Sequence, residues 1–176
     1  MAERIRKAIE NMDVAFEGKN LKVTASIGVA EMLQGEDDIK VIRRADDGVY
    51  SAKAAGRNQT YWNDGQQCLP VHAVPKTAAP GNKIPSGPGS AKPSAPEADL
   101  PSREGFTDEL QRRISESHRF GVSLSIMQLN ILDYDQLEKS YGNAVGKLLL
   151  DSVAQFIRSS LRDMDLLGQL CKGSFV

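Results

Sequence analysis

The sequence has few of the residues that build covalent frameworks and metal centres. Its two cysteines, Cys68 and Cys171, are too few for a disulfide framework and lack metal-ligand spacing, so we expect unpaired thiols in a reducing cytosol. Its two histidines, His72 and His118, have no cysteine or carboxylate at ligand spacing, and we expect ordinary surface residues. A disulfide scaffold and a histidine–cysteine metal centre are therefore not expected.

A strong charge of one sign and a long apolar run are also absent. The formal net charge of the 176 residues is −1 and is balanced along the chain, so no basic face for nucleic acid is expected. No apolar run approaches the roughly 20 residues that cross a bilayer, and no leader pattern opens the chain. These absences predict a soluble cytoplasmic protein with no nucleic-acid or membrane partner.

Proline is missing from most of the chain and concentrated in one stretch. All eight prolines lie between Pro70 and Pro101, among glycine, serine, alanine and lysine residues without apolar periodicity. Such a composition cannot bury enough surface to offset the entropy of ordering it. We therefore predict a disordered linker over residues 64–100, between a front segment (residues 1–63) and a rear segment (residues 101–176). Each segment is near the lower size limit for an independent core, so the two either pack together or need partner chains.

Apolar periodicity predicts alternating helices and strands in both segments. In the front segment it predicts a helix over 2–12, a strand over 21–29, a helix capped by Asp37 or Asp38 and ending near Gly56, and a short strand over 59–62, where Tyr61 and Trp62 would close a core edge. In the rear segment it predicts a helix over 106–114, a strand over 122–131, a helical turn over 134–140, a helix over 143–161 and a strand over 165–170. This alternation indicates an α/β layer fold.

Longer motifs add a family resemblance to this pattern. The front segment contains AERIRKAIE, VTASIGVA and RADDGVYSAKAAGRN, and the rear segment contains LPSREGF, LNILDYDQLEKSYGNAVGKLLL and LRDMDLLGQLCKGSF. The front segment resembles the back half of the GGDEF domain family, the diguanylate cyclases, and the rear segment resembles its front half. The resemblance implies an α/β fold with a GGDEF-type (palm-like) mixed sheet and packed helices, split into two segments and either permuted or truncated.

The resemblance also implies an activity and its metal requirement. The family condenses two GTP molecules into cyclic di-GMP, and the triphosphates require Mg²⁺ held by carboxylate oxygens. In this sequence the family's first metal carboxylate corresponds to Asn130, and the two carboxylates of its signature turn correspond to Gly173 and Ser174. An amide and a hydroxyl do not replace that negative charge. We therefore expect no metal and no catalysis by this chain alone, with Mg²⁺ present only if GTP is bound.

Other family positions in the rear segment are substituted as well. The glycines of the signature turn correspond to Cys171 and Lys172, ahead of Phe175. The guanine-reading residues correspond to Glu138 and Lys147, and a lysine of the preceding short turn corresponds to Asp135. Asp133, Asp135 and Glu138 form a carboxylate cluster in sequence, but they occupy positions that are not ligands in the family, and we interpret them as a solvated face.

Two pairs of residues keep a match to functional positions. Lys53 and Arg57 match a phosphate-contacting pair, and the alternative is that they are solvated cations at a helix end, where they suit the helix dipole. Arg162 and Asp165 form an RxxD sequence that binds cyclic di-GMP as an inhibitory site in the family, and the alternative is a local ion pair.

The reversed order is compatible with two arrangements. The segments form one permuted domain, or the chain spans the junction of two truncated tandem domains. In both, the strand that returns from the signature turn into the sheet is expected to be missing, and the exposed edge would favour dimerisation or strand exchange.

Three functional hypotheses follow. The first is a degenerate, non-catalytic module that binds GTP or cyclic di-GMP, or that pairs with another GGDEF-type domain or with itself as a homodimer. The second is a composite diguanylate cyclase to which this chain donates Lys53 and Arg57. The third is a non-functional fragment.

Overall fold

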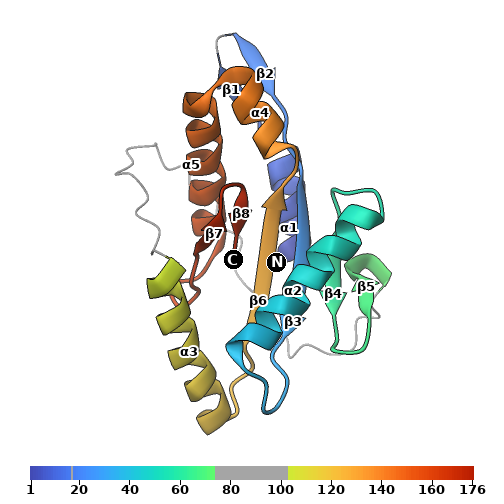
Figure 1. The fold of residues 1–176 in the computed structure, drawn as a ribbon, viewed down its shortest axis with the longest axis vertical. Coiled ribbons are helices and arrows are strands. Elements are labelled where there is room, and N and C mark those ends of the chain that lie inside the picture. Colours follow the sequence, from blue (N-terminus) through green and yellow to red (C-terminus); the bar gives the residue numbers. More distant parts are fainter. Residues whose placement is uncertain (17, 74–102) are drawn as a thin grey trace, which may run out of the picture.

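A six-stranded sheet runs through both segments of the chain (Figure 1). This computed structural model describes residues 1–16, 18–73 and 103–176. The front segment contributes the strands β3 (Ala25–Glu31), β4 (Thr60–Asn63) and β5 (Cys68–Pro70), and the rear segment contributes β6 (Ser125–Ile131), β7 (Gln169–Cys171) and β8 (Ser174–Phe175). Their order is β5-β4-β3-β6-β8-β7. A separate hairpin pairs β1 (Val14–Phe16) with β2 (Lys19–Leu21).

The two segments meet at the centre of this sheet. Strand β3 runs antiparallel to β6 over seven residue pairs, from Ala25 opposite Ile131 to Glu31 opposite Ser125. On its other side β3 is parallel to β4, which makes the sheet mixed. Because the longest ladder joins the front segment to the rear segment, the two segments fold on each other in one sheet.

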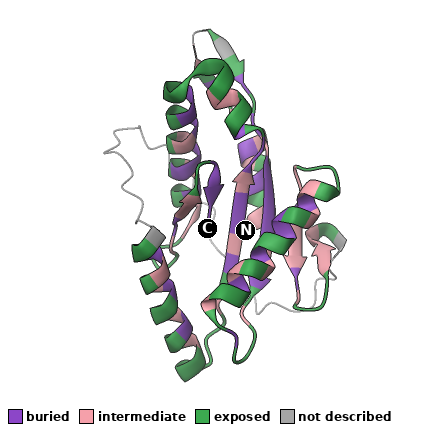
Figure 2. Ribbon diagram, viewed as in Figure 1, coloured by how far each residue is buried: buried purple, intermediate pink, exposed green. Residues whose placement is uncertain are grey.

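Helices cover both faces of the sheet. One face carries α1 (Ala2–Glu10) and α5 (Asn143–Ser160), and the other carries α2 (Asp38–Ala54) and α3 (Arg103–Phe120), while α4 (Tyr134–Tyr141) links β6 to α5. Figure 2 shows that the buried residues concentrate where helices and sheet meet. The predicted α/β fold with packed helices is confirmed. Among the helices that the structure describes, none combines the length and apolar character needed to span a bilayer.

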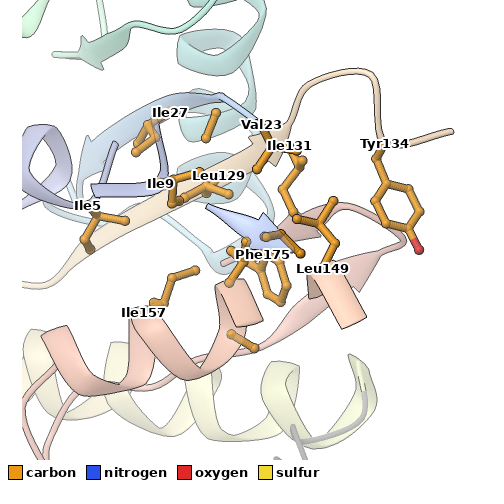
Figure 3. Close-up of a cluster of buried hydrophobic side chains, with 14 of the residues drawn as sticks. Ile5, Ile9, Val23, Ile27, Leu129, Ile131, Tyr134, Leu149, Ile157 and Phe175 are labelled. Carbon is orange, nitrogen blue, oxygen red and sulfur yellow. The ribbon is translucent and has the colours of Figure 1, made fainter. Parts of the chain in front are cut away.

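The larger core lies between α1, α5 and the sheet. It gathers apolar side chains from both segments, as Figure 3 shows, and includes Ile5, Ile9, Ile27, Leu129, Ile131, Leu149, Ile157 and Phe175, none more than 3% exposed. A second core on the α2 and α3 face contains Val41, Ala45, Phe106, Leu110, Ile114, Ile126 and Val176. Since burial of one such side chain stabilises a fold by about 1.5–3 kcal/mol, the shared cores hold the two segments together.

A close approach of backbones positions α2 on the sheet. A Cβ atom at Gly28 of β3 would lie 1.9 Å from the carbonyl oxygen of Ala45. Only glycine therefore allows helix and strand to pack at this separation. Asp37, one of the two residues predicted as the cap, caps the start of the helix, because its carboxylate accepts a hydrogen bond of 2.8 Å from the Lys40 N–H.

Several predicted boundaries are wrong. Residues 64–73, assigned to the linker, contain β5 and a short 3₁₀ helix (Val71–Ala73), so β4 is an interior strand and Tyr61 and Trp62 do not close an edge. The remainder of the predicted linker, residues 74–100, lies outside the described residues. The returning strand expected to be missing is partly present, because β8 pairs with β6 through Phe175 opposite Leu129 and Ser174 opposite Asn130.

Candidate functional site

The β7–β8 hairpin contains the residues that the sequence analysis assigned to the family's signature turn. Cys171 and Ser174 pair across it, and Lys172 and Gly173 form its two-residue loop. Gly173 has φ +75°, a left-handed conformation that favours glycine, and its carbonyl oxygen accepts a hydrogen bond of 2.7 Å from the Ile131 N–H. The loop thus requires a glycine at a position that the sequence analysis assigned to a carboxylate of the family.

Two of the three residues assigned to metal-ligand positions come together in the β6–β8 ladder. Asn130 on β6 lies opposite Ser174 on β8, so their side chains share one face of the sheet. That face is covered by α2, because Gln128, two residues earlier on β6, donates a hydrogen bond of 2.9 Å to Asp46 of that helix. Ser174 is only 2% exposed. The sheet topology therefore places the amide of Asn130 and the hydroxyl of Ser174 on one face.

These residues do not fit a magnesium ion. Mg²⁺ binds hard oxygen ligands, usually with one or two carboxylates in its coordination sphere. Gly173 has no side chain, and Asn130 and Ser174 carry no charge. In residues 1–73 and 103–176, as far as they are described, no group of three or more histidine, cysteine, aspartate or glutamate side chains is placed to hold a metal.

Glu138, which the sequence analysis assigned to a guanine-reading position, forms an ion pair with Lys172 of the hairpin loop. Lys172 Nζ lies 2.8 Å from Glu138 Oε1, and this hydrogen bond raises the pKa of Lys172. Lys147 of α5 lines a hollow of about 380 Å³ together with Lys172, Tyr134, Asn143 and Gln169. The two residues assigned to guanine recognition, Glu138 and Lys147, therefore lie near the hairpin, and an ion pair joins Glu138 to its loop. Asp133 and Asp135 are exposed, as predicted for a solvated face.

Lys53 and Arg57 lie at the carboxyl end of α2. Lys53 is in the last turn of the helix, and Arg57 follows it with φ +65°, its N–H donating a hydrogen bond of 2.9 Å to the Ala52 carbonyl. In the described part of the chain neither side chain has a hydrogen-bond or ion-pair partner. The two cations are thus available to a ligand, and they also suit the negative end of the helix dipole.

A polar network that the sequence analysis missed anchors the loop after α2. Arg6 is 8% exposed and donates a hydrogen bond of 2.7 Å from Nη1 to Asn58 Oδ1, while Asn58 Nδ2 donates one of 2.8 Å to Glu10 Oε1. Arg6 Nη1 also donates to Glu10 Oε2 at 3.0 Å. Because Asn58 follows Arg57 directly, this network fixes the backbone that presents Arg57. The (i, i+4) spacing of Arg6 and Glu10 was the available signal.

The RxxD sequence forms a closed turn. The Arg162 N–H donates a hydrogen bond of 2.9 Å to Asp165 Oδ2, and the Asp165 N–H donates one of 2.9 Å to the Arg162 carbonyl. The carboxylate therefore bonds to the backbone, and among the described residues it forms no ion pair with the Arg162 guanidinium.

The two histidines and the two cysteines lie as the sequence analysis expected. His72 and His118 are exposed, and Cys68 and Cys171 are free. The predicted site thus divides into three places: the hairpin with Asn130 and Ser174, the end of α2 with Lys53 and Arg57, and the turn at Arg162.

Comparison with known proteins gives a consistent result. The family model described as "Diguanylate cyclase, GGDEF domain" matches residues 1–59 and 96–176, which include both segments. The chain is 40% identical over 60 residues to Diguanylate cyclase A of Treponema denticola, covering 34% of this chain and 16% of that protein. It is 44% identical over 61 residues to Response regulator PleD of Caulobacter vibrioides, covering 33% of this chain and 13% of that protein.

The matched region is a small part of each relative. The chain spans less than a fifth of the length of either relative. The comparison with solved structures gives no match. Because the family model covers most of the residues, and because the mixed sheet with packed helices agrees with it, the chain belongs to the GGDEF domain family.

Proposed function

We propose that this chain is a degenerate GGDEF module that does not itself convert GTP into cyclic di-GMP. The observation that supports this most directly is the pairing of Asn130 with Ser174 at the positions of the family's metal carboxylates. Magnesium lowers the barrier of phosphoryl transfer by neutralising charge on the phosphates, and a site without carboxylates does not retain the ion. The module instead acts in cyclic di-GMP signalling, by binding GTP or cyclic di-GMP or by pairing with another GGDEF-type domain or a second copy.

The catalytic part of this proposal has a direct test. Purified chain is incubated with GTP and Mg²⁺, and the products are separated by chromatography. We expect no cyclic di-GMP above the level of a reaction without protein. Formation of cyclic di-GMP by the purified chain, lost in an Asn130→Ala variant, would contradict the proposal.

A second candidate is a composite cyclase in which this chain supplies phosphate contacts to a partner domain that holds the metal. The observation in its favour is that the Lys53 and Arg57 side chains have no partner among the described residues, and that Arg57 lies on the anchored loop after α2. In this case the chain would raise the cyclase rate of an added GGDEF domain, and the Lys53→Ala, Arg57→Ala double variant would not. Lys40→Ala, an exposed cation earlier on α2, is the matched control.

The binding part of the proposal is tested by calorimetry with cyclic di-GMP. The proposed inhibitory site requires the Arg162 guanidinium, whereas the Asp165 carboxylate already bonds to the turn. We expect heat of binding in the unmodified chain and its loss in Arg162→Ala. Absence of heat in the unmodified chain removes cyclic di-GMP as a ligand and leaves GTP binding and domain pairing.

The third hypothesis, a non-functional fragment, makes a different thermodynamic prediction. The shared cores and the ladder of seven pairs between β3 and β6 support a cooperative fold. We expect one cooperative thermal transition, because small single domains unfold in an all-or-none manner. A gradual loss of signal without a transition would favour the fragment.

A further inference from the structure

The outward side of α2 carries the two most exposed large hydrophobic side chains among the described residues. Ile39 and Tyr50 are each 73% exposed, whereas the other exposed hydrophobic side chains range from 38% to 67%. The two residues stand three helical turns apart, about 16 Å along the axis, so they lie on the same side of the helix. That side is opposite Val41 and Ala45, which are buried against the sheet and α3. Both side chains are therefore placed to contact a partner that lies along α2.

A cation and an anion lie between these two side chains. Arg43 and Asp47 are four residues apart on the same side of the helix, and both are exposed. In the described part of the chain, neither side chain has a hydrogen-bond or ion-pair partner. The neighbouring charges are engaged, because Lys40 lies 3.4 Å from Asp37 and Asp46 accepts a hydrogen bond from β6. Arg43 and Asp47 are thus the charges that α2 offers to a partner.

The order of these four residues is self-complementary when two copies of α2 pack antiparallel. The midpoint between Ile39 and Tyr50 lies within one residue of the midpoint between Arg43 and Asp47. A two-fold axis at this point brings Ile39 of one copy to Tyr50 of the other, and Arg43 of one copy to Asp47 of the other. Each contact then forms twice, as in any two-fold symmetric interface. A parallel arrangement would instead bring like charges together, which is unfavourable.

The spacing of these contacts suits a pair of nearly aligned helices. Each contact of Ile39 with Tyr50 would lie about 8 Å from the axis along the helix, so a crossing angle of about 20°, as in helix bundles, keeps both contacts. Burial of these apolar side chains supplies the affinity. The exposed pairs of Arg43 with Asp47 add little affinity but determine the antiparallel direction. Because one helix face is small against the roughly 1,200–2,000 Å² of stable interfaces, the association should be weak and reversible.

We propose that the outward side of α2 is an interface at which two copies of this chain pair antiparallel as a weak, symmetric dimer. Figure 2 shows that exposed residues recur along the whole length of α2. The inference rests on the proposed function, since it names the face and the direction by which the module pairs with a second copy. The interface contains neither the β7–β8 hairpin nor the turn at Arg162. It is therefore tested without nucleotide.

Charge reversal on separate copies tests the antiparallel direction. Sedimentation velocity is measured at low ionic strength and at chain concentrations up to about 1 mM, the weak end of measurable association. The unmodified chain should dimerise reversibly. Arg43→Asp alone and Asp47→Arg alone each place like charges in contact, and each should weaken dimerisation about tenfold. An equimolar mixture of the two variants should regain it, because every charge then faces its opposite on the other copy.

Two outcomes of this experiment overturn the proposal. The first is an unmodified chain that stays monomeric at every concentration, and the second is a mixture that pairs no better than either variant alone. A misfolded variant would not be rescued by mixing, so recovery cannot arise from changes in folding. Either failure leaves the proposed lack of catalysis standing, because that is tested with GTP and Mg²⁺. Cyclase activity of the chain would conversely leave the dimer interface untouched.

A matched pair of truncations tests the location of the interface. Tyr50→Ala removes an apolar contact that would form twice in the dimer, and Leu148→Ala removes an exposed apolar side chain on α5, across the sheet. Both changes leave the net charge unaltered. Tyr50→Ala should lower the association constant about tenfold or more, and Leu148→Ala should leave it unchanged. Equal effects of the two variants place the interface elsewhere and overturn the proposal.

Discussion

Replacing Gly173 by alanine tests whether the hairpin at the signature turn has been rebuilt around glycine. A Cβ atom at this position would lie 3.0 Å from Tyr134 Cβ and 3.1 Å from Tyr134 Cγ. Tyr134 is 4% exposed and belongs to the larger core, so it cannot move away without disturbing its neighbours. The residue also has φ +75°, where a side chain is strained.

Gly35 separates these two costs. It has the same φ of +75°, but a Cβ atom there would meet no heavy atom within 4 Å. Gly35→Ala should therefore cost only the left-handed backbone strain, about 1–2 kcal/mol. Gly173→Ala should cost the same strain plus about 1–3 kcal/mol for overpacking against Tyr134.

Equilibrium urea unfolding gives the required free energies, provided that the slope with denaturant stays constant among the variants. We expect Gly173→Ala to lower the free energy of unfolding by clearly more than Gly35→Ala. Equal losses would refute the argument that Tyr134 packs against the hairpin. Gly173→Asp, which returns a carboxylate to the family position, should also be destabilising, because it meets the same ring.

Three further changes test the fold and its polar networks. Gly28→Ala should unfold the protein or destabilise it more than any surface change, since the new Cβ would lie 1.9 Å from the Ala45 carbonyl oxygen; normal thermal unfolding would contradict the close approach. Lowering the pH should destabilise the fold partly through Glu36, whose folded pKa lies below its ordinary value because Arg44 donates hydrogen bonds to its carboxylate. The stabilisation from ionised Glu36 is complete above its unfolded pKa and is lost as the pH falls through the lowered folded pKa. The urea midpoint of Glu36→Gln should therefore fall less steeply with decreasing pH in this range than that of the unmodified chain. Parallel pH dependences of the two midpoints would contradict this. Arg6→Met should cost about 1–3 kcal/mol by removing the donor to Asn58, as measured by urea unfolding, and an unchanged stability would show that the network is dispensable.

The sequence predicted the elements with strong periodicity better than the irregular ones. The strand pattern over 122–131 and the helical pattern over 143–161 correspond to β6 and α5, because their apolar side chains fill the core. The predicted strand over 165–170 is wrong in its first part, since Asp165 bonds to the turn at Arg162 and the strand begins at Gln169. Strand β5 has no alternating pattern, and its residues are only half-buried.

The sequence assigned residues to the candidate site but did not predict their contacts. The family resemblance assigned Asn130 and Ser174 to ligand positions, and the β6–β8 ladder places them opposite each other. The ion pair of Lys172 with Glu138 joins residues 34 apart in sequence, and its formation depends on how α4 packs beside the hairpin.

The central claim is that the chain lacks the charge needed to hold Mg²⁺ with GTP, and equilibrium binding of GTP tests it most directly. Calorimetric titrations with GTP are compared in excess Mg²⁺ and in excess chelator. We expect Mg²⁺ to produce no gain in the affinity for GTP, because Asn130 and Ser174 offer an amide and a hydroxyl in place of carboxylates. A gain of tenfold or more with Mg²⁺, about 1.4 kcal/mol, that disappears in both Asn130→Ala and Ser174→Ala would contradict it.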